Sequence, residues 1–93
     1  MKYTVRFTKA FKKDLKKAEK QGKDLDLLWD VVEKLSNGET LDARYLDHPL
    51  KGKYINSREC HIEPDWLLIY AIRGDILVLA LNRLGTHSEL FNK

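Results

Sequence analysis

Apolar residues recur with two different periods in the first part of the chain. They occupy every second position over residues 2–7, which predicts a strand. Over residues 9–21 they recur every three to four positions among lysines, which predicts an amphipathic helix. Thr8 is a suitable residue to cap the start of this helix, and Gly22 is suitable to end it.

A second apolar stripe follows at helical spacing. Asp24 stands where a cap is expected, and residues 36–38 (SNG) are typical of a helix end, so a second helix is predicted between them. Residues 39–56 show neither period, and their HP and KGK segments favour a loop that runs over the surface.

The second half of the chain has the pattern of three strands. Residues 58–63 alternate, with Cys60 and Ile62 expected to point inward and Glu59, His61 and Glu63 outward. An apolar run over residues 66–72 suits a strand covered on both faces, and a final strand is predicted over residues 76–84.

The resulting order is strand, helix, helix and three strands, with a short C-terminal helix. It predicts an α+β fold in which an antiparallel-rich sheet carries the two N-terminal helices on one face. The length of 93 residues predicts a single domain over residues 1–93.

Composition narrows the class of protein. No apolar run approaches the roughly 20 residues of a membrane span, and no hydrophobic signal region follows Met1. Cys60 is the single cysteine and therefore has no partner for an internal disulfide. A reducing cytoplasm is the predicted location.

Positive charge is concentrated in the first predicted helix. Residues 9–23 hold seven lysines and two acidic residues, a net charge of +5, whereas the whole chain carries +3. Such a field favours a polyanion, either a nucleic acid or an acidic protein. The alternative is a solvated helix face.

Three histidines, His48, His61 and His87, are candidates for proton transfer, because an imidazole with a pKa of about 6.5 exchanges protons at neutral pH. His87 lies inside a capping-box pattern formed by Thr86 and Glu89, and would begin a short helix. The backbone N–H groups of a helix start favour anions such as phosphate and disfavour a cationic imidazole. Alternatively, His87 is simply a polar residue at a helix start.

Three segments of the chain resemble the YafQ branch of the RelE-type toxins. They are HPLKG at residues 48–52, HIEPDWLLIY at 61–70 and RLGTHSELF at 83–91. The resemblance implies a RelE/ParE-like fold and a toxin of a type II toxin–antitoxin pair. It further implies an endoribonuclease that cuts messenger RNA in the ribosomal A site, contacts ribosomal RNA through the basic helix, and is silenced by an antitoxin.

The active-site positions of that family fall on residues that are all present here, namely His48, His61, Asp65, Trp66, His87 and Phe91. Lys51 and Leu84 depart from the family pattern at neighbouring positions.

RNA cleavage without a metal requires a base for the ribose 2′-hydroxyl, charge stabilisation at phosphorus, and an acid for the 5′-oxygen. We expect His87 to be the acid, with a substrate phosphate restoring its charged form. Asp65 or His61 is the expected base, and the choice between them is open. His48 would orient or stabilise the phosphorane.

Substrate contacts are expected from residues around these groups. Arg83 would clamp a phosphate, Trp66 and Phe91 would stack on bases, and the loop lysines Lys51 and Lys53 would contact the RNA backbone. Three of the candidate site residues have a plainer alternative: Trp66 belongs to the core, His48 is only a turn residue before Pro49, and Arg83 pairs with Glu89 or another carboxylate.

Two other functions compete with RNA cleavage. Three histidines and Asp65 are enough ligands for zinc, but no His-x-x-x-His pair or cysteine cluster supports a dedicated site, so no metal or other cofactor is expected. A ParE-like toxin that binds DNA gyrase would share the fold without being an enzyme. The histidines favour the enzyme, because a pure binding module has no chemical need for them.

Overall fold

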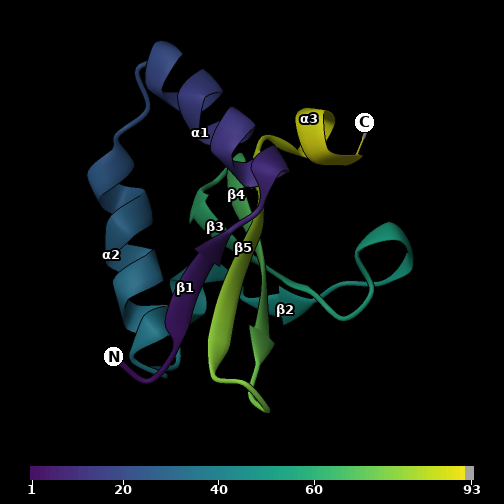
Figure 1. Ribbon diagram of the computed structural model, residues 1–93. Coiled ribbons are helices and arrows are strands. Elements are labelled where there is room, and N and C mark those ends of the chain that lie inside the picture. Colours follow the sequence, from purple (N-terminus) through teal and green to yellow (C-terminus); the bar gives the residue numbers. More distant parts are fainter. Residues whose placement is uncertain (92–93) are drawn as a thin grey trace.

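The computed structural model describes residues 1–91, and a single five-stranded sheet organises them (Figure 1). The strand order is β1-β5-β4-β3-β2; β1 runs parallel to β5, and the other pairs are antiparallel. The α+β prediction is confirmed, with one additional strand. The elements are β1 (Thr4–Phe7), α1 (Lys9–Lys20), α2 (Leu25–Ser36), η1 (Ala43–Tyr45), β2 (His48–Pro49), η2 (Gly52–Tyr54), β3 (Arg58–Glu63), β4 (Trp66–Arg73), β5 (Val78–Gly85) and α3 (His87–Phe91).

The first two helices start at the predicted caps. The hydroxyl of Thr8 accepts a hydrogen bond from the backbone N–H of Phe11 at 3.0 Å, and the carboxylate of Asp24 accepts one from Asp26 N–H at 3.0 Å. Gly22 ends the first helix with a φ of +75°, a conformation that side chains disfavour. Across residues 1–91, no helix has the length and apolar character needed to cross a membrane.

Helices α1 and α2 cover one face of the sheet. Their apolar stripes meet every second residue of the strands in one core, which includes Phe11, Leu28, Val31, Leu68 and Leu79. Strand β4 is also covered on its opposite face, where Leu67 and Ile69 pack against Leu90 of α3. The predicted double coverage of this strand is therefore confirmed.

The segment 39–56 differs from the predicted loop. Two residues of it, His48 and Pro49, form the edge strand β2 and pair with Glu59 and Arg58 of β3. A two-residue strand that contains proline has no visible alternation, so the sequence pattern does not reveal it. Cross-strand contacts with β3 hold it in place instead.

The last strand begins two residues later than predicted. Ile76 and Leu77 are 60% and 51% exposed in the turn before β5, and Leu77 has a left-handed φ of 52°. Their apolar character extended the predicted strand, whereas the backbone at Leu77 breaks it.

Candidate active site

The three histidines gather on the face of the sheet opposite α1 and α2. His48 comes from β2, His61 from β3 and His87 from the start of α3. The ring centroids of His48 and His61 are 6.3 Å apart, and those of His61 and His87 are 5.6 Å apart. Residues distant in sequence therefore form one row of imidazoles, as the sequence predicts.

Asp65 fixes the ring of His87. One carboxylate oxygen accepts hydrogen bonds from the backbone N–H of His87 at 2.9 Å and from its Nδ1 at 2.7 Å. These two bonds, the backbone bond first, hold the pKa of Asp65 below its usual value. With Nδ1 occupied, Nε2 is the nitrogen of His87 that remains for a substrate.

The helix start that carries His87 is built as predicted. Thr86 N–H donates to the carboxylate of Glu89 at 2.9 Å, and Glu89 N–H donates to the hydroxyl of Thr86 at 3.1 Å. Lys17 of α1 forms an ion pair with the same carboxylate and is the main cause of the lowered pKa of Glu89. The capping box therefore anchors α3 to the basic helix.

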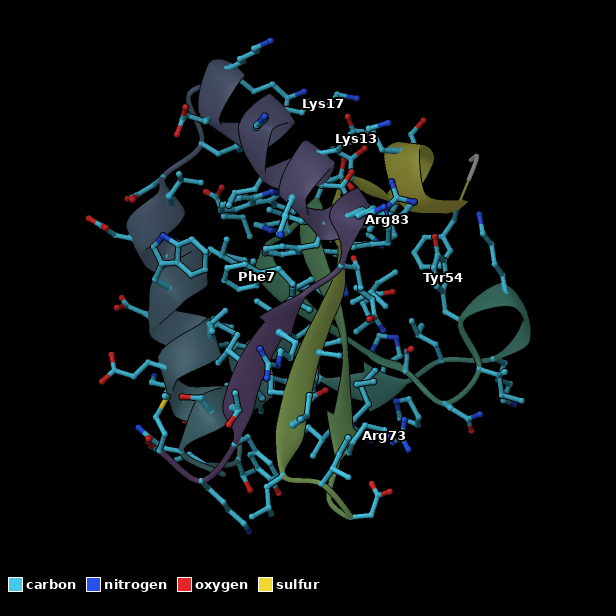
Figure 2. All side chains as sticks on the ribbon, viewed as in Figure 1. Phe7, Lys13, Lys17, Tyr54, Arg73 and Arg83 are labelled. Carbon is cyan, nitrogen blue, oxygen red and sulfur yellow. The ribbon has the colours of Figure 1, made fainter. Side chains whose placement is uncertain are left out.

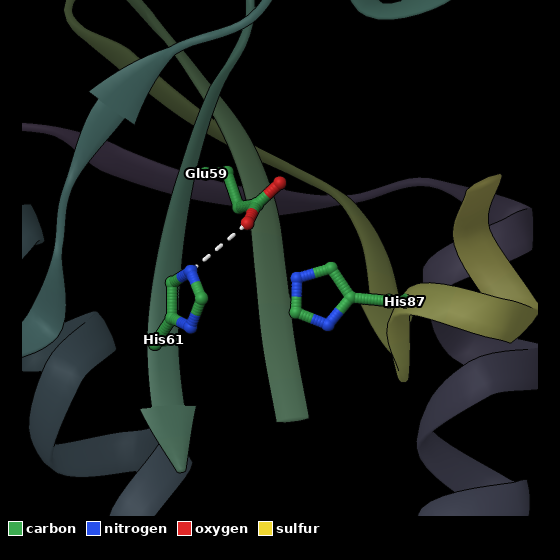
Figure 3. Close-up of side chains that lie close together, drawn as sticks. All are labelled: Glu59, His61 and His87. Atoms are coloured by element: carbon green, nitrogen blue, oxygen red, sulfur yellow. Dashed lines mark ion pairs between the residues drawn. The ribbon is translucent and has the colours of Figure 1, made fainter. Parts of the chain in front are cut away.

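Glu59 forms the second carboxylate–imidazole pair of the site. Its carboxylate lies 3.1 Å from Nε2 of His61, and the ring of His87 points toward this pair (Figure 3). The side chain of Glu59 is 5% exposed and that of His61 15% exposed. The prediction that Glu59 points into solvent is wrong, because its carboxylate is buried beside the ring of His61.

Sequence reasoning missed Glu59 as a functional residue, although a signal was present. Glu59 and His61 are two positions apart on a strand, so their side chains share one face. An acidic residue at that spacing from a candidate histidine is a potential partner for its ring.

Glu59, His61 and His87 also have the geometry to hold a metal ion. One ligand atom from each lies within 4.8 Å of the others. The ligand set considered in the sequence analysis was the three histidines and Asp65. Asp65 is not part of the observed set, because it binds Nδ1 of His87, the nitrogen that faces away from Glu59 and His61 (Figure 3).

His48 is exposed at the sheet edge and is held by its own segment. Its Nδ1 lies 2.6 Å from the carbonyl oxygen of Leu46, whose left-handed φ of 49° turns the chain there. The neighbouring Asp47 carboxylate accepts hydrogen bonds from Tyr70 Oη at 2.7 Å and Arg58 Nε at 3.1 Å. Burial raises the pKa of Tyr70, and the hydrogen bond to Asp47 raises it further. The network fastens the segment before β2 beside β3 and β4.

Trp66 does not lie in the site. It is 1% exposed and belongs to the core between the sheet and the first two helices. Side chains alternate along β4, and Trp66 points to the same side as Leu68 and Tyr70, away from the histidines. The predicted stacking role of Trp66 is therefore wrong.

Arg83 pairs with Asp14 of α1 through two bonds, Nε to Oδ2 at 2.7 Å and Nη2 to Oδ1 at 3.1 Å. Asp14 raises the pKa of the guanidinium, whose side chain remains 27% exposed. The carboxylate partner is thus Asp14 and not Glu89. Figure 2 places Arg83 beside Tyr54, below α3.

Aromatic rings border His87 on its other side. The centroid of Phe91 lies 6.4 Å from that of His87, and Tyr54 meets Phe91 edge to face at 5.5 Å. The exposed Lys51 and Lys53 occupy the same segment as Tyr54, with Lys53 Nζ 5.4 Å from the Tyr54 ring centroid. Phe91 therefore lies beside His87, and Tyr54 links it to Lys53.

The family model for the bacterial YafQ toxin of type II toxin–antitoxin systems matches residues 3–92. The chain belongs to the YafQ family. The mRNA interferase toxin YafQ of Escherichia coli K12 is 39% identical over 88 residues, which cover 94% of both chains.

Solved structures of YafQ-like toxins have the same fold. A metal-bound toxin from Helicobacter pylori is 49% identical, with a TM-score of 0.90 over 96% of this chain and 99% of that chain. The YafQ of the E. coli DinJ–YafQ toxin–antitoxin complex is 37% identical, with a TM-score of 0.87 over 98% and 99%. This YafQ-family toxin is thus a homologue of mRNA interferases, which are endoribonucleases, and the matches do not support the ParE-like alternative.

Proposed function

We propose that this YafQ-family toxin cuts messenger RNA in the ribosomal A site by metal-free general acid–base catalysis through the ribose 2′-hydroxyl. A cognate antitoxin neutralises it. The observation that carries the proposal is a pair of carboxylate–imidazole units, Asp65–His87 and Glu59–His61, whose imidazole centroids are 5.6 Å apart.

His87 is the general acid in this proposal. A helix start disfavours a cationic ring, but the Asp65 carboxylate on Nδ1 supplies the compensating negative charge without a substrate phosphate. The proton on Nε2 then passes to the 5′-oxygen as the phosphorus–oxygen bond breaks. The 2′-oxygen forms the new bond to phosphorus and leaves a 2′,3′-cyclic phosphate.

The Glu59–His61 pair is the proposed base that takes the 2′-proton. Asp65 is the weaker choice of base, because its pKa is lowered and its oxygen already accepts two bonds from His87. His61 Nε2 faces an acceptor, the Glu59 carboxylate, so a proton gained by the pair is shared between them.

The surrounding residues are proposed to hold the RNA. His48 stabilises the phosphorane from the sheet edge, Arg83 and the lysines Lys51 and Lys53 bind phosphates, and Phe91 stacks on a base. Arg83 is already oriented by Asp14, so its planar group needs little ordering on binding.

The lysines of α1 are proposed to contact ribosomal RNA. Lys13 and Lys17 lie on this helix close to α3, on the side of the molecule that carries Arg83 (Figure 2). The E. coli YafQ relative is solved in complex with the DinJ antitoxin, which supports a protein antitoxin as the partner of this chain as well. The cytoplasm is the proposed location, since ribosomes are there.

The test is cleavage of ribosome-bound message by the purified wild type beside His87→Ala and Glu59→Gln. Each substitution removes one proton-transfer group, so we expect cleavage to fall about 10²- to 10⁴-fold while thermal melting stays close to wild type. Asp75→Asn in the β4–β5 turn is the control and should cut normally. Intact message with the wild type refutes the function, and cutting by His87→Ala refutes the acid.

Metal removal tests the metal-free mechanism. Cleavage should survive EDTA, and added Zn²⁺ should inhibit it, because the ligand atoms of Glu59, His61 and His87 are those that the chemistry uses. Loss of cleavage in EDTA that Zn²⁺ restores would contradict this mechanism.

A further inference from the structure

A pocket opens beside the histidines, between α2, η1 and the end of β3. Its volume is about 440 Å³, within the range of roughly 300–1,000 Å³ that is usual for small-ligand sites. His61 lines this pocket and also belongs to the catalytic row. A group bound in the pocket therefore contacts a residue of the proposed active site.

Leu46 connects the pocket to a second histidine. Leu46 lines the pocket and is 58% exposed, and its carbonyl oxygen lies 2.6 Å from Nδ1 of His48. Leu46 therefore forms part of the pocket wall and also orients the ring of His48. The pocket and the proposed active site thus depend on the same residue.

One wall of the pocket suits a flat ring. The guanidinium of Arg44 lies 4.7 Å from the ring centroid of Tyr45, and its Nη2 donates to the Tyr45 hydroxyl at 2.9 Å. Nucleobases that leave the helical stack are commonly held on aromatic rings and on arginine planes.

The pocket also carries two carboxylates, Asp30 from α2 and Glu63 from the end of β3. Carboxylates repel a phosphate group but accept hydrogen bonds from the exocyclic amino group of a base. The residues that line the pocket therefore suit the neutral base of a nucleotide. In this arrangement the phosphate of the nucleotide binds Lys51, Lys53 and Arg83.

We propose that this pocket is a nucleobase subsite for the nucleotide next to the cut, and that it selects bases with an exocyclic amino group over uracil. Adenine, cytosine and guanine present amino hydrogens, whereas uracil has only carbonyl oxygens and a ring N–H. The proposal rests on the RNA cleavage proposed above and adds the determinant of its sequence preference.

The experiment maps cleavage sites on ribosome-bound messages that differ in the bases next to the cut. The variants are Tyr45→Ala, Asp30→Asn and Glu63→Gln, with Asp26→Asn as the control, because it makes the same change of charge on α2 outside the pocket. We expect the two carboxylate variants to lower the ratio of amino-base sites to uracil sites by about tenfold. Tyr45→Ala should weaken cutting at all sites, and Asp26→Asn should keep the wild-type ratio.

The outcomes separate the subsite from the activity. If the wild type cuts no RNA, the proposed function fails; if it cuts and the pocket variants keep the wild-type ratio, only the subsite is refuted. Melting curves identify a variant that fails to fold, and Asp30→Asn and Glu63→Gln test the subsite independently of each other. Variants that lose antitoxin affinity but keep the ratio would assign the pocket to the antitoxin and overturn the proposal.

Discussion

The two faces of the sheet are built from different interactions. The face under α1 and α2 is a continuous apolar core, with Phe11, Leu28 and Leu68 fully buried. The opposite face has a small apolar cluster around Leu67 and Leu90, and beside it lie the imidazole rings and their carboxylate partners. Stability is therefore concentrated on one face, which leaves the other free to hold polar groups that perform chemistry.

The difference between the faces is tested most strongly by Trp66→Ala. Removing this fully buried ring leaves a cavity in the core, and we expect the free energy of unfolding in urea to fall by about 3–5 kcal/mol. Phe91→Ala on the site face is the comparison and should cost less, since Phe91 is only half-buried. An equal loss of unfolding free energy in both variants would contradict the conclusion that stability is concentrated on the core face.

A smaller effect is expected from Asp47→Asn, which weakens the polar network beneath His48. The Asp47 carboxylate accepts from Tyr70 and Arg58, and weakening these bonds should cost about 1–3 kcal/mol in urea unfolding. The imidazole NMR signals of His48 should shift while those of His87 stay in place. The control is Asp42→Asn, which changes an exposed acidic residue in the same segment between α2 and β3. If the two variants are equally stable, the Asp47 network does not hold the site.

The smallest effect is expected at the ion pair that ties α3 to α1. The pKa of Glu89 is lowered in the fold, so its stabilisation is present above its unfolded pKa of about 4.3 and is lost as the pH falls through the folded value. Glu89→Gln should therefore lower stability by less than about 1 kcal/mol at neutral pH and by nearly nothing in acid. Urea unfolding of both proteins between pH 7 and pH 3 measures this, and a difference that grows in acid would contradict the sign.

The core face could be predicted from the sequence because buried apolar residues recur with the period of a helix or a strand. Alternation in β3 and the unbroken apolar run of β4 predicted their places in the sheet, and the Thr8 and Asp24 caps began the first two helices as expected. Errors arose where an apolar side chain is exposed, as at Ile76, because the pattern treats every apolar residue as buried.

The site face was readable only in part. The chemistry of the side chains identified the three histidines and Asp65 as candidates. The alternation of apolar and polar positions, however, wrongly predicted that Glu59 is exposed, and it did not decide whether Trp66 lies in the core or in the site. Which face of β4 looks toward α3 depends on how the helices pack, and a two-residue strand such as β2 exists only because β3 pairs with it.

The sequence by itself determined the α+β class, the helix caps, the basic helix and the chemical types of the site residues, because these follow from local spacing and composition. The tertiary structure alone decided the pairing of Asp65 with His87 and of Arg83 with Asp14. A salt bridge or hydrogen bond joins groups that are distant along the chain, and no local pattern records which distant partner the folded sheet brings within about 3 Å.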